Sequence, residues 1–385
     1  MNSPRKVLWI SCVGEKGGAE VYMLNLLRGL DRTEFQAGVA MLRPGPLEKE
    51  LEIGGIRTHV FQAHRMRRVD QVLVTIWKLS RLIREQRYDL VHSNGFRAHV
   101  YGGLAALLAR VPEVWTTHTA EHPGISTSLI LKIPTERLLA NCPKTADFFI
   151  QAGLPTTMIW PGVDPEHLSR RTSREELSRR FSIPSGARWV MMGARFQRYK
   201  GHAHFLRALA SMPREHADVH GIITGGPMFG METDLVDELK QQVEGLGLSG
   251  RVHFTGFVPD EDLFGLIAAS VLVVHPALEE DFGLIVAEAQ MLGRPVLAYA
   301  STGPSEILID GKTGVLVPVG DERQLSSRLS GLLGAGAMIE TMGGAGRERC
   351  TRLFSAGEST RLLERVYRCC PERTVPGRIP SKALA

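Results

Sequence analysis

Glu280 and Glu288 are two carboxylates eight residues apart, where a loop passes into an apolar helical pattern. Eight residues span slightly more than two helical turns, so a helix that starts near Phe282 would direct both acids toward one end of a sheet. Glu288 lies among apolar residues, and ionised carboxylates are rarely buried without a partner. Glu288 is therefore a candidate ligand-binding group, whereas Glu279 and Asp281 are expected to be solvated.

Arg195 and Lys200 are two cations at the end of the strand-like run 189–195. Their spacing lets both reach one crevice, which suits a diphosphate because arginine forks onto phosphate oxygens and lysine adds a compact charge. The N–H groups that open the helix near Phe282 can bind the same anion, and Glu288 can accept two ribose hydroxyls. Each group alone is better explained as a surface charge or a helix cap. Together they fit a nucleoside diphosphate that carries a sugar.

A glycine-rich turn stands near the start of the chain, between a strand-like run at 6–13 and a helical pattern. Such a turn can present N–H groups to an anion or to a sugar hydroxyl. The spacing of Gly14, Gly17 and Gly18 is not that of a dinucleotide-binding fingerprint, so a plain tight turn remains the alternative. Asn94 and His118 also follow predicted strands, and they would lie at the same edge of a sheet.

Strand-like and helical runs alternate along both halves of the chain. The strand-like runs are 6–13, 37–42, 56–61, 88–95, 114–118 and 137–141 in the first half, and 189–195, 219–226, 252–256, 271–274 and 296–300 in the second. This alternation is typical of βαβ units and parallel sheets, which bind ligands at the carboxyl ends of their strands. We therefore predict an α/β protein with two doubly wound Rossmann-like domains that face a central cleft.

The overall composition favours an ordinary globular protein of two domains. The chain has 385 residues, of which 43% are hydrophobic and 23% charged. The five cysteines form neither a C-x-x-C pair nor a zinc-binding spacing, and they are expected to be reduced thiols in a cytoplasmic protein. The sequence contains neither the apolar core of a signal peptide nor a run of about 18 apolar residues, so no membrane span is expected.

The net charge of +5 falls entirely within the first 170 residues. A basic first half suits an anionic partner or an anionic membrane surface, and a mildly basic surface without a partner explains it equally well. The basic run 65–68 and the apolar run 130–133 are the candidate membrane contacts. We expect no nucleic-acid partner.

Two short patterns are interpreted as structural. Gly311-Lys312-Thr313 is similar to the end of a P-loop, but Glu306 stands where the motif needs a glycine, which predicts a turn. The acidic run 260–262 matches a D-x-D metal motif, yet it follows Pro259 and opens a helical pattern, which predicts an N-cap. We expect no metal site.

Several motifs together resemble the retaining glycosyltransferases of family 4, which have the GT-B fold. In the second half these are Arg195 with Lys200-Gly201, the run 280–289, Gly293–Val296, Thr302–Glu306 and Gly311–Val317. In the first half Gly17–Glu20, Asp89–Ser93, Thr117-His118 and Pro161–Asp164 stand in the family's order. The resemblance extends to about residue 368. The paired glutamates and the Arg195–Lys200 element are its specific parts.

The resemblance implies a role for each candidate residue. The expected catalytic residues are His118, Arg195, Lys200 and Glu280, and the expected donor-binding residues are Gly17, Gly18, Gly225, Phe282, Gly283, Leu284 and Glu288. Glu280 would contact hydroxyls of the donor sugar and Glu288 the ribose, while Arg195 and Lys200 would neutralise the diphosphate. The two N-terminal glycines would let their loop approach that diphosphate, and His118 would lie near the reacting centre.

The same resemblance implies a reaction, and the Pro, Gly and polar stretches of the chain suggest a domain plan. The reaction is transfer of a sugar from a nucleoside-diphosphate donor, with UDP preferred to GDP, to a glycan or lipid-linked acceptor with retention of configuration. It would serve the synthesis of cell-surface polysaccharide or glycolipid, at the cytoplasmic face of the membrane, without a metal or cofactor. The expected divisions are 1–168 for the acceptor, 169–354 for the nucleotide sugar, 355–370 for a helix that crosses back, and 371–385 for a disordered tail.

The sequence departs from the family pattern at two positions and leaves two alternatives open. Asp281 replaces a small glycine after Glu280, and Thr119 replaces the aspartate that usually follows the histidine, which affects how His118 is oriented. A GT-B epimerase would act on the sugar nucleotide without an acceptor. A non-catalytic binder would hold the sugar nucleotide unchanged, although Arg195, Lys200 and Glu280 are all present.

Overall fold

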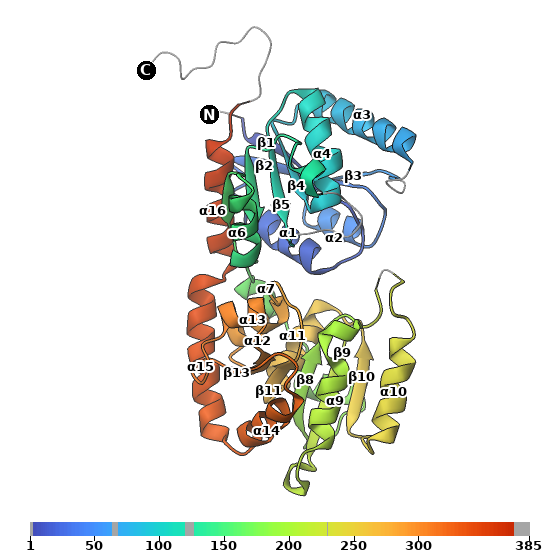
Figure 1. The fold of residues 1–385 in the computed structure, drawn as a ribbon, viewed down its shortest axis with the longest axis vertical. Helices are drawn as coiled ribbons and strands as arrows, with labels where there is room; N and C mark the ends of the chain where they lie inside the picture. Colours follow the sequence, from blue (N-terminus) through green and yellow to red (C-terminus); the bar gives the residue numbers. More distant parts are fainter. Residues whose placement is uncertain (1–2, 64–67, 120–126, 229, 373–385) are drawn as a thin grey trace. The chain divides into compact units, whose positions relative to one another are not determined.

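The computed structural model describes residues 3–63, 68–119, 127–228 and 230–372. They form two compact units: Met1–Gly162 together with Ala356–Ala385, and Val163–Ser355. Figure 1 shows that each unit has a sheet covered by helices on both faces. Among the described residues, no helix is both long and apolar enough to cross a bilayer, and no cluster of three or more His, Cys, Asp or Glu side chains is arranged to hold a metal.

The first unit is built on a seven-stranded sheet in the order β3-β2-β1-β4-β5-β6-β7. Its strands are β1 (Arg5–Ser11), β2 (Phe35–Met41), β3 (Arg57–Val60), β4 (Leu90–Asn94), β5 (Glu113–Thr117), β6 (Arg137–Ala140) and β7 (Thr156–Met158). Its helices are α1 (Gly18–Gly29), α2 (Leu47–Ile53), α3 (Val69–Glu85), α4 (Phe96–Ala109), α5 (Thr127–Ile130), α6 (Pro143–Gln151) and α16 (Ala356–Cys369). All strand pairs in this sheet are parallel, as the alternation predicted.

Strand β1 shows how the sequence divides the helices between the two faces of this sheet. Successive side chains of a strand point to opposite faces. Val7 and Trp9 pack in a core with α1 and α16, whereas Leu8 and Ile10 pack in a second core with α3 and α4. The unbroken apolar run at the start of the chain is therefore explained by burial on both faces.

Helix α16 is the last described helix, and it belongs to the first unit although 193 residues of the second unit precede it. Tyr367 is fully buried, and its hydroxyl lies 2.5 Å from Nδ1 of His92. The Nε2 atom of His92 lies 2.6 Å from the hydroxyl of Thr116, and Trp9 stacks on its ring. This buried network joins the C-terminal helix to three strands.

The second unit is built on a six-stranded sheet in the order β10-β9-β8-β11-β12-β13, again with all pairs parallel. Its strands are β8 (Arg188–Gly193), β9 (Val219–Thr224), β10 (Val252–Gly256), β11 (Leu272–His275), β12 (Val296–Tyr299) and β13 (Val315–Val317). Its helices are α7 (Pro165–Ser169), α8 (Arg174–Arg180), α9 (His202–Ala210), α10 (Leu235–Gly245), α11 (Asp260–Ala269), α12 (Leu284–Met291), α13 (Thr302–Ile307), α14 (Glu322–Leu333) and α15 (Gly336–Leu353).

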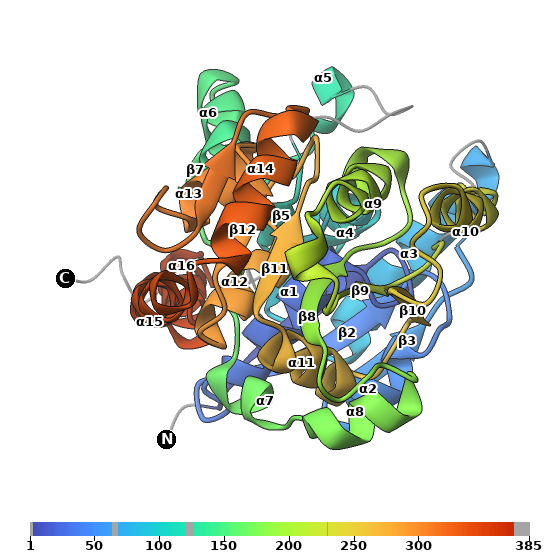
Figure 2. The ribbon, with the colours of Figure 1, turned by 90° about the horizontal axis from the view of Figure 1, so that it is seen from below.

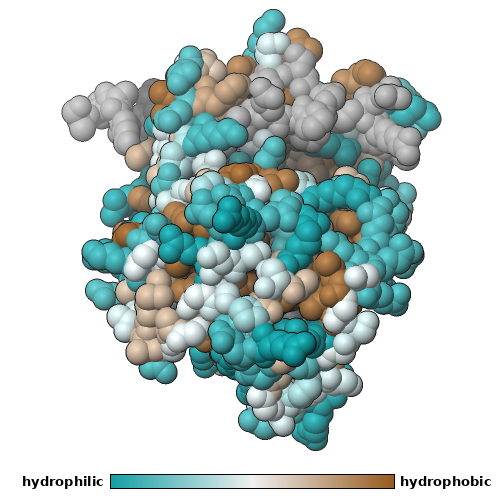
Figure 3. All heavy atoms as spheres, turned by 60° about the horizontal axis from the view of Figure 1, so that its bottom comes forward, coloured by the Kyte–Doolittle hydropathy of each residue, from teal (hydrophilic) through white to brown (hydrophobic). Residues whose placement is uncertain are grey.

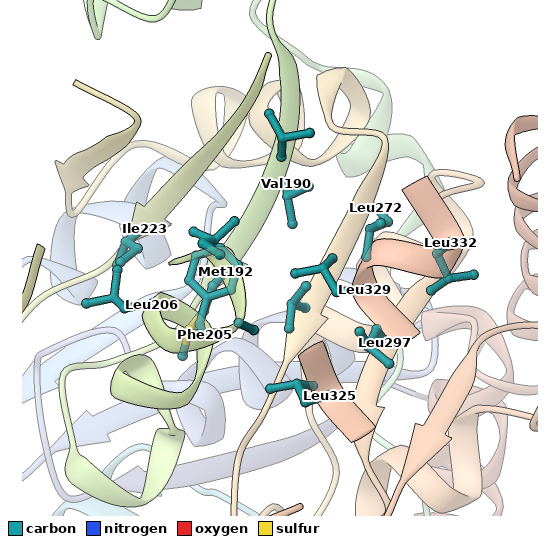
Figure 4. Close-up of a cluster of buried hydrophobic side chains, with 14 of the residues drawn as sticks. Val190, Met192, Phe205, Leu206, Ile223, Leu272, Leu297, Leu325, Leu329 and Leu332 are labelled. Atoms are coloured by element: carbon teal, nitrogen blue, oxygen red, sulfur yellow. The ribbon is translucent and has the colours of Figure 1, made fainter. Parts of the chain in front are cut away.

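One face of this second sheet carries a large buried apolar cluster. Side chains of β8 such as Val190 and Met192 meet Phe205 of α9 and Leu325 and Leu329 of α14 (Figure 4). Figure 2 shows α9 and α14 on one side of the strands, with α11, α12 and α15 on the other. In the space-filling view of Figure 3, hydrophilic residues dominate the displayed face and apolar residues form small separate groups.

Both strand orders reverse direction at one place, and these two places hold several of the candidate residues. In the first sheet the reversal lies between β1 and β4, and in the second it lies between β8 and β11. The loops that leave adjacent strands at such a reversal diverge and leave a crevice at the carboxyl edge, where doubly wound proteins bind ligands. The glycine turn and Asn94 follow β1 and β4, while Lys200 and Glu280 follow β8 and β11.

The boundary between the units lies six residues earlier than the expected division at 168/169, between Gly162 and Val163. Val163 pairs with Ser355 in a short bridge, and its N–H donates to the carbonyl of Phe354 at 2.8 Å. Because of this pairing, the chain enters and leaves the second unit at one place. The expected tail from residue 371 lies outside the described residues from 373 onward.

One local expectation was wrong, and another fails at one of its residues. Pro259, not an aspartate, precedes the first turn of α11, and Asp260 and Asp262 accept hydrogen bonds from His167 and Thr172 instead of capping the helix. Ile130 is 2% exposed, because it packs with Trp115 and Phe149 in a core, so it offers no surface to a membrane.

Candidate active site

Lys200, His275 and Glu280 form a compact charged cluster at the carboxyl edge of the second sheet. The Nζ atom of Lys200 lies 2.7 Å from Oε2 of Glu280, and Nε2 of His275 lies 3.0 Å from the same oxygen. Lys200 follows β8, His275 ends β11, and Glu280 lies in the loop that leads from β11 to α12. The structure therefore brings together two of the four predicted catalytic residues and adds a histidine.

The Lys200–Glu280 pair determines the charge state of this cluster. Burial raises the pKa of Glu280, but the positive charge of Lys200 and the hydrogen bond and charge of His275 outweigh that effect and lower the pKa to about 2. Glu280 is therefore a carboxylate over the whole physiological range. A lysine ammonium has three donors, so Lys200 can hold Glu280 and still offer a donor to an anionic oxygen.

Three glycines allow the loops of this cluster to approach one another. A Cβ atom on Gly201 would lie 2.0 Å from the carbonyl oxygen of Pro276, and one on Gly303 would lie 2.1 Å from that of Phe282. Gly303 also donates its N–H to the carbonyl of Glu280 at 2.8 Å. Gly283 has a φ of +88° and directly precedes α12. The loops after β8, β11 and β12 are therefore held together by backbone contacts that a larger residue would block.

Arg195 lies in the loop that leaves β8, five residues before Lys200. The N–H of Ala194 donates to the carbonyl of Thr224 at 3.0 Å, and that of Phe196 donates to Gly226 at 2.9 Å. A Cβ atom on Gly225, whose φ is +118°, would lie 2.1 Å from the carbonyl oxygen of Ala194. Gly225 thus serves to hold the Arg195 loop against the end of β9. That role is structural and leaves its predicted contact with a donor untested.

The remaining donor-binding candidates of this unit lie on or beside α12. Leu284 opens the helix, and Glu288 lies on its second turn with 9% of its surface exposed. The helix starts two residues later than expected, so Glu280 stays in the loop. The side chain of Phe282 is 3% exposed and packs edge-on against Phe354, which leaves its backbone as the part that a ligand can reach.

His118 follows β5 in the first unit and is held by Asn94, which ends β4. The Nε2 atom of His118 lies 2.7 Å from Oδ1 of Asn94, whose Nδ2 donates to the carbonyl of Ala19 at 3.2 Å. Because the amide of Asn94 uses its NH₂ group on Ala19, its oxygen must accept from Nε2–H of His118. The ring of Tyr22 packs edge-on against that of His118 at 5.4 Å.

Burial lowers the pKa of His118 to about 4, so its imidazole is neutral at physiological pH. With the proton fixed on Nε2 by Asn94, Nδ1 is the nitrogen that can accept a hydrogen bond or a proton. Thr119 replaces the usual aspartate, but His118 is still oriented, because Asn94 on the neighbouring strand fixes its ring.

The glycine turn is joined to His118 through the same asparagine. Gly17 precedes α1 and its N–H donates to the Glu20 carboxylate at 3.2 Å, while Gly18 is exposed at the first position of the helix. A Cβ atom on Gly14 would lie 2.4 Å from the backbone nitrogen of Gly45. Gly14 is therefore needed for packing, whereas Gly18 has open space around it, as a ligand-facing position requires.

Sequence reasoning missed His275 and the role of Asn94. His275 is the last residue of a strand and precedes Glu280 by five positions, so its place at the carboxyl edge was a usable signal. Asn94 was recognised as a strand-end residue, but its contact with His118 spans 24 residues and depends on the pairing of β4 with β5. No local pattern contains that pairing.

We expect a carboxylate in place of Asn94 to raise the pKa of His118. In Asn94→Asp, the new negative charge beside Nε2 favours the imidazolium, so the pKa moves from about 4 toward the ordinary value of histidine. Asn94→Leu removes the acceptor, leaves the pKa low and releases the fixed tautomer. Imidazole nitrogen and proton shifts measured by NMR across a pH titration report both changes. The other histidines are the internal control, and an unaltered His118 titration in Asn94→Asp would contradict the contact.

The low pKa of Glu280 predicts a specific loss of stability in acid. The carboxyl pKa is about 2 in the folded chain and 4.5 ordinarily, so the stabilisation is complete above pH 4.5 and is lost as pH falls toward 2. The difference in unfolding free energy between the wild type and Glu280→Gln should shrink by about 3 kcal/mol over that interval. Urea unfolding at successive pH values measures it, with Glu279→Gln as the exposed neighbour control. Parallel curves for wild type and Glu280→Gln would count against the pair.

Comparisons with known proteins match both units. The family model described as "Glycosyl transferases group 1" matches residues 173–349, and that described as "Glycosyltransferase Family 4" matches residues 16–167. The D-inositol 3-phosphate glycosyltransferase of Corynebacterium diphtheriae is 30% identical over 305 residues, which cover 73% of this chain and 70% of that protein. A protein of the same name from Catenulispora acidiphila is 28% identical over 93% of this chain and 92% of its own length. The crystal structure of Anabaena Alr3699/HepE in complex with UDP and glucose has a TM-score of 0.83 and 26% identity, and the match covers 94% of this chain and 99% of that chain.

Proposed function

The chain belongs to the group 1 glycosyl transferases of family 4, with their GT-B fold, and from this premise we propose that it transfers a sugar from a nucleoside-diphosphate donor to a glycan or lipid-linked acceptor with retention of configuration. UDP is the proposed nucleotide, because the similar Anabaena HepE was crystallised in complex with UDP and glucose. The proposed setting is the synthesis of cell-surface polysaccharide or glycolipid at the cytoplasmic face of the membrane.

The observation that supports this proposal most directly is the ion pair between Lys200 and Glu280 at the switch point of the second sheet. Departure of a nucleoside diphosphate places negative charge on a phosphate oxygen. Fixed cations at that place stabilise the charge without reorganisation, and Lys200 with Arg195 provides them on adjoining parts of one loop. The N-terminus of α12 adds backbone N–H groups to the same edge of the sheet.

In the proposed reaction Glu280 binds a sugar hydroxyl and does not act as a nucleophile. Lys200 and His275 both contact Oε2 of Glu280 and make the carboxylate weakly basic, which disfavours a nucleophile and favours the role of an oriented acceptor. Retention then follows from attack of the acceptor on the face that the diphosphate leaves, with the leaving phosphate oxygen accepting the acceptor's proton. Neutral His118, with Nδ1 as acceptor, is proposed to orient the donor sugar.

The curated relatives suggest a second class of acceptor. Proteins named D-inositol 3-phosphate glycosyltransferases match 73% to 93% of this chain at 28–30% identity. A phosphorylated polyol is therefore tested beside glycan and lipid-linked acceptors. The basic first half of the sequence, which carries the whole net charge of +5, is compatible with an anionic acceptor of either kind.

The function is tested by incubating the purified chain with a panel of UDP and GDP sugars, first alone and then with each class of acceptor. Mass spectrometry and proton NMR of the products identify the donor, the acceptor and the anomeric configuration. The expected result is a new glycoside with the donor's own configuration and free UDP. Conversion of the donor to an isomer without an acceptor would establish an epimerase, and tight donor binding without any product would establish a non-catalytic binder.

A further inference from the structure

Helix α3 carries large apolar side chains on the face turned away from the sheet. Its inner face is buried through Val72, Ile76, Leu79 and Ile83, which pack in the core of the first unit. Its outer face leaves Val69, Leu73, Val74 and Trp77 with 63%, 60%, 51% and 53% of their surfaces exposed. An amphipathic helix of a globular protein normally has polar residues there, so this apolar outer face needs an explanation.

The neighbouring helix α4 also exposes large apolar side chains, beside the C-terminal end of α3. Leu107 and Leu108 are each 54% exposed near its C-terminal end. The guanidinium of Arg84, in the last turn of α3, donates to the carbonyl of Leu108 at 3.4 Å, so the C-terminal ends of the two helices adjoin (Figure 1). We call the exposed apolar residues of the two helices the α3–α4 patch; it comprises Val69, Leu73, Val74, Trp77, Leu107 and Leu108.

Positive charges accompany the patch. The exposed cations of α3 and its flanking residues are Arg68, Lys78, Arg81, Arg84 and Arg87, against the two acids Asp70 and Glu85. The acids pair with Arg68 and Arg81, at 3.4 Å and 2.6 Å. The side chain of Arg81 also lies over the ring of Trp77, 5.9 Å from its centre. The surface around the apolar residues is therefore positive, by three charges among these residues.

We infer that the α3–α4 patch docks the first unit on a bilayer surface that contains anionic lipids. Tryptophan and leucine side chains can enter the boundary between headgroups and acyl chains, while lysine and arginine extend to the phosphates. Anionic lipids attract such cations, which adds an electrostatic contribution to the burial of the apolar side chains. A second copy of this chain fits less well, because an isologous contact would bring two positive patches together.

This surface differs from the membrane contact that the sequence suggested. Of that basic run, residues 65–67 lie outside the described residues, and Ile130 of the apolar run is buried. The sequence does not reveal the outer face of α3, because apolar residues occur on both faces of the helix and nothing in the sequence shows which of them the sheet covers. The exposed fractions of the side chains in the structure separate the buried apolar residues of α3 from the exposed ones.

The inference deepens the proposed function, because docking would bring the protein to a lipid-linked acceptor in the membrane. Only this purpose of docking rests on the proposed function. Docking itself requires no catalysis. Vesicle binding without sugar transfer would leave the docking surface valid and the proposed reaction wrong. Sugar transfer to a water-soluble acceptor without vesicle binding would leave the reaction valid and the docking surface wrong.

The test is flotation of the full chain with vesicles of phosphatidylcholine alone and of phosphatidylcholine with about one third phosphatidylglycerol, at low and high salt. Leu73→Ser with Trp77→Ser removes apolar contacts, and Lys78→Gln with Arg84→Gln removes two charges. Ile53→Ser with Lys49→Gln is the matched control, because both residues are exposed on α2 of the same unit. Circular dichroism and thermal unfolding confirm that each variant is folded.

We expect binding to the anionic vesicles, weaker binding at high salt, and a blue shift of tryptophan fluorescence that Trp77→Phe abolishes. Trp9, Trp115 and Trp189 are fully buried and Trp160 is half-buried, so the loss of the signal in Trp77→Phe is what assigns it to Trp77 rather than to Trp160. The apolar double variant should lose most of its binding. The charge double variant should bind about 25-fold more weakly, which corresponds to about fivefold for each charge near an anionic surface. The matched control should bind as the wild type does.

Two results would overturn the inference. One is equal binding of the wild type and both patch variants, or binding that does not depend on anionic lipid. The other is a dimer in sedimentation experiments that dissociates in Leu73→Ser/Trp77→Ser while no variant floats with vesicles, which would assign the patch to a second copy of the chain.

Discussion

Lys200→Ala is expected to lower the kcat of sugar transfer by about 10²–10³-fold, the effect of removing one preorganised charge from a developing oxyanion. The cause is twofold. The ammonium is lost from the edge of the second sheet where the diphosphate would leave, and Glu280 loses the partner that lies 2.7 Å from its Oε2. Steady-state kinetics with the donor identified by the product assay measure the change, with Lys240→Ala, on the exposed side of α10, as the matched control.

A double variant separates the loss of charge from the loss of structure. Lys200→Met with Glu280→Gln removes both charges, so the buried glutamate is no longer left without its lysine. We expect this double variant to recover part of the stability lost in Lys200→Ala and none of the activity.

Glu288→Ala should instead weaken nucleotide binding, which raises KM more than it lowers kcat. Near-normal turnover in Lys200→Ala would overturn the assignment of this cluster to the reaction.

Gly201→Ala is expected to destabilise the second unit by about 3 kcal/mol or more and to lower turnover with it. Gly201 has a φ of +77°, and an added Cβ atom would lie 2.0 Å from the carbonyl oxygen of Pro276. Since both are backbone positions, relief of the clash must move the Lys200 loop away from the loop that carries Glu280. Thermal unfolding measures the loss of stability, and steady-state kinetics of the same preparation measure the loss of turnover.

Gly250→Ala is the matched control for this prediction. Gly250 also has a positive φ, of +81°, but an added Cβ atom would have no neighbour within 4 Å. Gly250→Ala should therefore lower the free energy of unfolding only by the strain of a left-handed alanine, about 1 kcal/mol, and leave turnover unchanged. If the two variants were equally stable, the contact with Pro276 would not be a constraint on the site.

The alternation of strands and helices could be predicted well because the central strands, such as β1, β8 and β11, are apolar runs buried along most of their length. The run 189–195 became β8 (Arg188–Gly193), and the glycine and polar residues that end it mark the carboxyl edge. Lys200 and Glu280 were likewise predicted at the carboxyl ends of strands, and the structure places both there. Local composition was enough for these features.

Features that depend on which side chain meets which neighbour could not be predicted. Ile130 looked exposed beside Lys132, yet a cluster around Trp115 covers it. The Asp260 carboxylate looked like a cap, yet His167 provides its partner from a helix 93 positions earlier in the chain. The orientation of His118 depends on Asn94 in the same way, because two strands must pair before the contact exists.

The placement of α16 in the first unit has a consequence for how the chain is made. Residues 163–355 are complete as a folding unit before Ala356–Cys369 have been synthesised, whereas the first unit still lacks the helix that buries Tyr367 beside His92. During synthesis the first unit therefore lacks one of the helices that cover this face of its sheet, beside α1, while the second unit can fold first. Chaperone binding to nascent chains should accordingly centre on the N-terminal half and end only when the last helix has left the ribosome.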